Sequence, residues 1–147
     1  MKNCAYSIKT TRVREPDFPY TGQRFACTEE VVSFLRSLQS ADVEKLVTLY
    51  LDNQNGLICI QVQSGIVNQA VIYPREIIRH ALLVNASTII LAHNHPSGSL
   101  IPSVDDHDVL KKIVDVGKLL EIVVHDNIII GGDTGQYISF RARGLMP

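Results

Sequence analysis

The sequence has few cysteines and no excess of either charge. Its three cysteines are Cys4, Cys27 and Cys59, and none of them forms a C-x-x-C pair, so neither a disulfide framework nor a cysteine-based zinc site is indicated. Fourteen Lys and Arg against fifteen Asp and Glu give a formal net charge of −1, which offers no basic surplus to a nucleic-acid backbone. We therefore expect a cytoplasmic protein with reduced thiols, and bulk charge gives nucleic-acid binding no support.

Long apolar segments are also missing. The first thirty residues contain no apolar core of a signal peptide, and no later run approaches the roughly 18 apolar residues that a membrane-spanning helix needs. There are no repeats, low-complexity tracts or linkers. With 147 residues, 46% hydrophobic and 20% charged, the chain is expected to form one soluble domain over residues 28–147, preceded by an N-terminal arm over residues 1–27.

Apolar periodicity predicts an α/β fold. Residues 4–9 suit a short edge strand, and Thr28 is a plausible N-cap of a first helix over residues 28–39. "KLVTLYLD", the turn "NQNG" and "LICIQVQ" predict an antiparallel hairpin, and "IVNQAVIY" over residues 66–73 predicts a third strand of the same meander. Pro74 then opens a helix whose apolar face consists of Ile77, Ile78, Ala81 and Leu82.

The second half of the chain continues this alternation. "STIILAHNH" is a short continuous apolar run, typical of a central strand covered on both faces. Ser103 can cap a long helix, and residues 121–140 supply the last strands around a glycine-rich turn. The apolar stripe predicted for the long helix consists of Val109, Leu110, Ile113, Val114, Gly117 and Leu120.

Two histidines at the end of the central strand are the strongest sign of chemistry. Residues i and i+2 of a strand point to the same side, so His93 and His95 can project into one cleft. Asp106, near the start of the following helix, can supply a third ligand. Two imidazoles and one carboxylate are typical of catalytic zinc sites, in which the fourth position holds a water whose pKa falls to about 7.

Each of these residues also has a structural explanation. A histidine at a strand end is commonly a surface or hydrogen-bonded side chain, and Ser103 with Asp106 fits a capping box as well as it fits a site. His80, His107 and His125 have no comparable context, and we expect them to be surface or hydrogen-bonded residues. Other hydrolase signatures, including H-E-x-x-H and G-x-S-x-G, are missing from the sequence.

The spacing of the site residues resembles that of a known family. His93-Asn94-His95, seven residues, Ser103, two residues and Asp106 match the H-x-H-x7-S-x2-D signature of the JAB/MPN (JAMM) metalloprotease superfamily. "PREII", "ALLVNASTIILAHNHPSG" and the C-terminal "YISFRARGLM" are similar to its bacterial RadC branch. The resemblance covers most of the chain from about Thr28 onward and implies a three-layer α/β/α fold of the cytidine-deaminase-like kind, with a mixed sheet between helices.

The resemblance also implies roles that spacing alone does not reveal. The family's upstream glutamate falls on Glu44 in "VEKLVTLYLD", which from the residues alone is merely an acid before a strand. In this family such a glutamate is the general base and then the general acid, while the position of Ser103 stabilises the oxyanion. His93, His95 and Asp106 would hold one Zn²⁺ per chain, although the same donors also suit iron, nickel or copper. A peptide or isopeptide would be the substrate.

Two other functions stay open at this level. The RadC name suggests a role in DNA repair or recombination in which the metal is structural or serves a nuclease, and a scaffold without activity is a third possibility. The chain departs from the RadC pattern in two places: we expect no helix-hairpin-helix region ahead of the domain, and Asn127 replaces the histidine of "DHIIIG". Neither the substrate nor the oligomeric state follows from the sequence.

Overall fold

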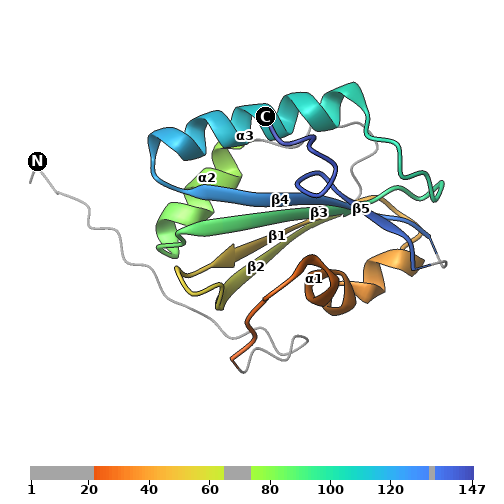
Figure 1. Ribbon diagram of the computed structural model, residues 1–147, viewed down its shortest axis with the longest axis horizontal. Helices are drawn as coiled ribbons and strands as arrows, with labels where there is room; N and C mark the ends of the chain where they lie inside the picture. The colour runs from red at the N-terminus through yellow and green to blue at the C-terminus, as the bar shows by residue number, and fades with distance from the viewer. Residues whose placement is uncertain (1–21, 65–73, 133–134) are drawn as a thin grey trace, which may run out of the picture.

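The computed structural model describes residues 22–64, 74–132 and 135–147, which build one five-stranded sheet with helices on both faces (Figure 1). The predicted strands over residues 4–9 and 66–73 lie outside these ranges. The strands are β1 (Lys45–Leu51), β2 (Leu57–Ser64), β3 (Thr88–Asn94), β4 (Val123–Ile130) and β5 (Tyr137–Ser139), in the order β2-β1-β3-β4-β5.

The sheet is mixed, as predicted. β1 is antiparallel to both β2 and β3, β4 is antiparallel to β5, and β3 and β4 run parallel. The parallel pair needs a crossover, and α3 (Val104–Leu119) provides it. The hairpin of β1 and β2 turns at residues 52–56, where Asn55 takes the left-handed backbone conformation with φ 60°.

The helices complete three layers. α2 (Pro74–Leu83) and α3 lie on one face of the sheet, and α1 (Thr28–Phe34) with the 3-10 helix η1 (Arg36–Ser40) lies on the other (Figure 1). β3 is buried along its whole length because both faces are covered. The expected three-layer α/β/α architecture is therefore confirmed.

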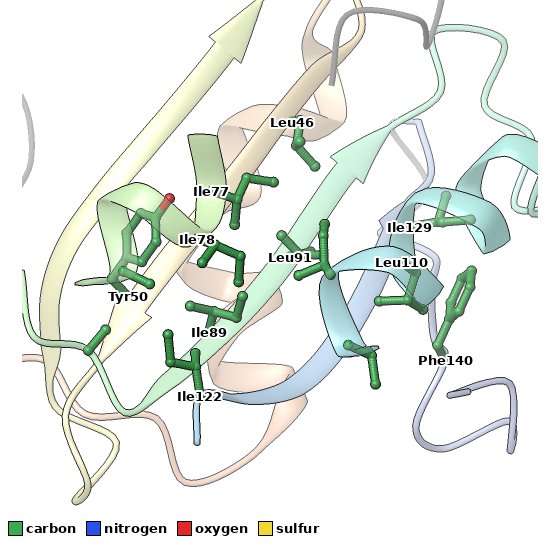
Figure 2. Close-up of a cluster of buried hydrophobic side chains, with 14 residues drawn as sticks. Leu46, Tyr50, Ile77, Ile78, Ile89, Leu91, Leu110, Ile122, Ile129 and Phe140 are labelled. Atoms are coloured by element: carbon green, nitrogen blue, oxygen red, sulfur yellow. The ribbon is translucent and has the colours of Figure 1, made fainter. Parts of the chain in front are cut away.

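Alternating residues of the strands belong to two hydrophobic cores, one on each face of the sheet. On the α2 and α3 face, Leu46, Tyr50, Ile89, Leu91 and Ile129 pack against side chains of the two helices, as Figure 2 shows. On the opposite face, a second cluster joins the strands to α1 and η1; it contains Val31, Leu35, Leu38, Val47, Leu49, Ile90, Ala92 and Ile128. Phe25, within the predicted N-terminal arm, is buried in this second cluster.

The first helix differs from its prediction at both ends. Its N-cap is Cys27, which makes no capping hydrogen bond through its side chain, whereas Thr28 lies inside the helix and donates to Asp126 Oδ2 at 3.5 Å. The helix also ends at Phe34 and gives way to η1, so the predicted helix over residues 28–39 is wrong in its second half. The buried positions in this region are compatible with both an α-helix and a 3-10 helix. They are Val31, Leu35 and Leu38, and spacings of four and three residues do not distinguish a period of 3.6 residues from one of 3.0 over so short a span.

Two residues assigned to apolar faces are exposed instead. Leu82, 56% exposed, lies about 100° around α2 from the buried Ala81, so it points away from the sheet. Leu120 is the C-cap of α3, where the backbone is no longer helical, and its side chain is exposed instead of continuing the buried stripe. Among the described residues, no helix is both long and apolar enough to cross a membrane.

Candidate metal centre

The polar residues singled out in the sequence meet at one edge of the sheet. β3 ends at this edge just after His93, and β1, being antiparallel to β3, begins there, so that Leu46 lies opposite His93. Glu44 therefore lies beside the histidines, because it immediately precedes β1. α3 starts at the same edge before crossing back to β4, which brings Ser103 and Asp106 to the same place.

The donor atoms converge closely. His93 Nε2 lies 3.1 Å from His95 Nε2 and 3.3 Å from Asp106 Oδ1, and His95 Nε2 lies 3.6 Å from Asp106 Oδ2. One carboxylate oxygen of Glu44 and one ring nitrogen each of His93 and His95 all lie within 4.8 Å of one another. Glu44, His93 and His95 thus form a group able to hold a metal ion. The carboxylate of Asp106 faces the same two imidazoles from the start of α3.

The spacing of these atoms fits a tetrahedral ion. Metal bonds of about 2.0–2.2 Å at the tetrahedral angle place neighbouring donor atoms about 3.3–3.6 Å apart. The 3.3 Å from His93 Nε2 to Asp106 Oδ1 and the 3.6 Å from His95 Nε2 to Asp106 Oδ2 fall within this range, and the 3.1 Å between the two Nε2 atoms lies slightly below it. Glu44 belongs to the same group within a wider limit of 4.8 Å. Two imidazoles and one carboxylate are therefore compatible with zinc, and equally with iron, nickel or copper.

The loop after β3 orients the second histidine. His95 Nδ1 lies 2.9 Å from the carbonyl oxygen of Ser99 and must donate to it, because a carbonyl only accepts. In the neutral ring the lone pair is then on Nε2, the atom that faces His93 and Asp106. The loop closes through a hydrogen bond from Gly98 N to His95 O, with Gly98 at φ 75°. A hydrogen bond on the far ring nitrogen is the usual arrangement for a metal-binding histidine.

Asp106 combines a structural position with its place in the site. Ser103 Oγ accepts from Asp106 N at 3.0 Å, and Asp106 Oδ2 accepts from Ser103 N at 2.8 Å, so the two residues form the capping box of α3. The capping explanation raised by the sequence is therefore correct. The same carboxylate nevertheless faces both imidazoles. Capping holds Asp106 in the rotamer that presents its oxygens to the histidines.

Burial and hydrogen bonds within the site shift the pKa values of Asp106, Glu44 and His95. Burial raises the pKa of Asp106, but hydrogen bonds from His93 and His95 lower it by more, so that this carboxyl is ionised throughout the neutral range. Burial raises the pKa of Glu44, and the two imidazoles only partly offset the increase. The hydrogen bond to Asp106 raises the pKa of His95, and burial opposes that increase. Of the two acids, Glu44 is thus the one that more readily takes up a proton.

The other three histidines have ordinary partners, as expected. His80 Nδ1 donates to the carbonyl oxygen of Glu76 at 2.7 Å within α2. His107 packs its ring against Phe140, with centroids 5.2 Å apart. His125 lies beside Arg141, and burial followed by that guanidinium lowers its pKa.

Two asparagines beside the site were not assigned a role in the sequence. Asn127 is buried and lines a cavity of about 20 Å³ together with His93 and Asp106, which is room for about one water. Asn94 lies between the two histidines and contacts the segment that carries Glu44. An asparagine at the end of a continuous apolar strand was the available signal for Asn94, since a buried amide requires partners.

A larger cavity, about 300 Å³, lies on the α1 face and is lined by Asp126, His125 and Arg141. It is not part of the histidine group. Asp126 accepts hydrogen bonds there from Ser139 Oγ at 2.5 Å, Asn127 N at 2.8 Å and Arg141 N at 3.0 Å. This carboxylate therefore ties the turn after β5 to β4 and reads as a structural element.

Comparison with known proteins gives a consistent family assignment. Residues 25–145 match the family model described as "RadC-like JAB domain". A UPF0758 protein of Histophilus somni (strain 2336) is 40% identical over 146 residues, which cover 98% of this chain and 64% of the relative. The UPF0758 protein YkfG of Escherichia coli (strain K12) is 41% identical over 127 residues, covering 85% of this chain and 79% of the relative.

A third relative matches over a shorter span. A UPF0758 protein of Methanosarcina acetivorans is 43% identical over 104 residues, covering 70% of this chain and 44% of the relative. The chain thus spans about two thirds or less of the length of the Histophilus and Methanosarcina relatives. The match across residues 25–145 includes every residue of the metal centre, and the chain belongs to the RadC-like JAB domain family.

Proposed function

We propose that this domain is a zinc-dependent hydrolase of amide or isopeptide bonds. One observation carries the proposal: the two imidazoles and the Asp106 carboxylate approach one another to 3.1–3.6 Å, and the Glu44 carboxyl group lies beside them. Such a donor set leaves a position for water and substrate, as catalytic rather than structural zinc sites do.

The two acids have different roles in this proposal. His93, His95 and Asp106 would hold the ion, because Asp106 lies 3.3 Å and 3.6 Å from the two ring nitrogens and has the lowered pKa that keeps it ionised. Zinc, when bound, supplies a Lewis acid for the scissile carbonyl and makes the attacking water more acidic. Glu44 accepts the proton of that water and passes it to the leaving amine nitrogen. Its raised pKa suits a group that must both take and release a proton near neutral pH.

Ser103 contributes at the same edge. Its hydroxyl oxygen accepts from Asp106 N, and a hydroxyl also carries one donor. We assign that donor to the oxygen on which negative charge develops when the carbonyl carbon becomes tetrahedral. A single oxyanion donor of this kind is worth about 10²–10³ in kcat, so Ser103→Ala should reduce turnover by that factor if the assignment is correct.

Metal content and turnover of two matched variants test the proposal. Glu44→Gln and Asp106→Asn each replace a carboxylate by an amide of the same shape. Glu44→Gln should retain near-stoichiometric zinc by elemental analysis and lose cleavage of a peptide and isopeptide library, whereas Asp106→Asn should lose the zinc itself. A zinc-loaded wild type that cleaves no library member, or a Glu44→Gln variant as active as wild type, contradicts the proposal. Salt-sensitive DNA binding by such an inactive protein would instead favour the repair function.

A further inference from the structure

Asn94 occupies an unusual position between the two histidines. Successive residues of a strand point to opposite faces, so Asn94 points away from His93 and toward the side of the sheet that carries α1 and η1. It is the last residue of β3 and only 2% exposed. A buried carboxamide costs folding free energy unless its donors and acceptor are all used.

The partners of Asn94 all belong to one segment. Its Oδ1 accepts from Lys45 N at 2.8 Å, and its Nδ2 donates to Val43 O at 3.1 Å and to Ala41 O at 3.4 Å. A carboxamide has two N–H donors, and both are engaged here. The Val43 carbonyl and the Lys45 amide lie on either side of Glu44 in the chain. The Asn94 side chain therefore hydrogen bonds to the backbone both before and after Glu44.

These side-chain hydrogen bonds continue the contact between β1 and β3 beyond their last backbone pair. The backbone pairing of β1 with β3 begins at Leu46 opposite His93, so Glu44 lies beyond the last paired residues of the two strands. The carboxamide of Asn94 has an N–H donor and a C=O acceptor, as a peptide group does. It hydrogen bonds to Lys45 N and Val43 O, just beyond the pair of Leu46 and His93. The segment bearing Glu44 is thereby joined to the strand that carries both histidines.

We propose that Asn94 is a positioning residue that holds Glu44 against the imidazole pair. The inference rests on the proposed function, in which Glu44 transfers the proton. Displacing a reacting group by about 1 Å can cost about 10²-fold in rate, so a carboxylate one residue before β1, outside the paired residues of the sheet, needs such a restraint. Asn94 itself touches no ligand atom of the centre; its effect passes entirely through Glu44.

Kinetics of a double-mutant cycle test this role on the zinc-loaded protein. Asn94→Ala should lower kcat for a cleaved peptide by about 10–100-fold with KM unchanged, because substrate binding does not involve the amide. In the Glu44→Gln background, Asn94→Ala should lower kcat no further. Ser139→Ala is the matched control: Ser139 is equally buried and hydrogen bonded, but its partners are Asp126 and Ala142. Multiplicative losses in the double variant, or a kcat for Asn94→Ala equal to that of Ser139→Ala, would overturn the inference.

Amide hydrogen exchange tests the same restraint without any substrate. Loss of the bond from Lys45 N should make this amide exchange about tenfold faster in Asn94→Ala, while amides in the middle of β1 and β3 keep their wild-type rates. If no peptide is cleaved by the wild type, the proposed function fails but this measurement still decides whether Asn94 holds the Glu44 segment. Unchanged exchange at Lys45, or equal acceleration throughout the sheet, contradicts a local positioning role.

Discussion

Asp106 takes part both in the capping box of α3 and in the metal centre, and two substitutions should separate these roles. Ser103→Ala removes the hydroxyl that accepts from Asp106 N and leaves both Asp106 oxygens in place. Asp106→Asn keeps an oxygen that can accept from Ser103 N but removes the carboxylate that faces His93 and His95. The first change should therefore affect stability, and the second should affect metal binding.

The magnitudes follow from the contacts. Loss of a serine N-cap costs about 1 kcal/mol, which for a domain of this size lowers Tm by about 2–4 °C. Zinc at a free concentration of about 100 times its Kd stabilises the folded state by about 2.7 kcal/mol, or about 5–10 °C. Ser103→Ala should thus melt lower than wild type with and without zinc, yet retain the full zinc-induced increase. Asp106→Asn should lose that increase.

Differential scanning calorimetry of metal-free and zinc-supplied protein measures both effects, and elemental analysis gives the zinc bound per chain. Because the pKa of Asp106 is lowered in the folded state, its contribution to metal-free stability is present above its unfolded pKa of about 3.9 and is lost as pH falls toward the folded value. The stability of Asp106→Asn should accordingly decline less steeply in acid. An Asp106→Asn protein that keeps the zinc-induced increase would refute Asp106 as a ligand and leave it only as a cap.

Three further predictions concern the scaffold. Burial raises the pKa of Tyr50 well above its usual value, so stability should be full below the unfolded pKa of about 10 and fall by about 1.4 kcal/mol per pH unit as pH rises from there toward the folded value. Urea unfolding at pH 9–12 should show this slope in wild type and not in Tyr50→Phe; equal slopes would contradict it. Gly117→Ala should destabilise the protein by about 1–3 kcal/mol, because the added Cβ would lie 2.5 Å from the backbone oxygen of Ile122. The exposed neighbour Lys118→Ala is its control in the same urea titration, and equal midpoints would refute the clash. Asp126→Ala should cost about 3 kcal/mol or more, since Ser139 and Asn127 each lose an acceptor in a buried place and Arg141 N loses one in a part-buried place. Thermal unfolding beside the exposed Asp115→Ala checks this, and a similar Tm for the two variants would be the contrary result.

Local patterns in the sequence were sufficient for much of the site. His93 and His95 share one side of β3 because side chains alternate along a strand, and this alternation is encoded by the neighbouring apolar residues. Ser103 and Asp106 form the capping box that their spacing predicts, since capping depends only on residues three apart. The buried central strand, the β1–β2 hairpin and the long helix after Ser103 were predictable for the same reason.

Other features depend on which elements become neighbours in space. Glu44 was identified through family resemblance alone, and it reaches the histidines because β1 pairs antiparallel with β3. Asn94 gains its role from backbone groups 49 to 53 residues away, which no local period encodes. The replacement of the helix by η1 after Phe34 and the exposure of Leu82 were also decided by packing against the sheet. By itself the sequence determined the local elements and the histidine and capping pattern, because these depend on residues close in the chain; the tertiary structure decided how Glu44, Asn94 and the ligand atoms meet, because long-range strand pairing sets those distances.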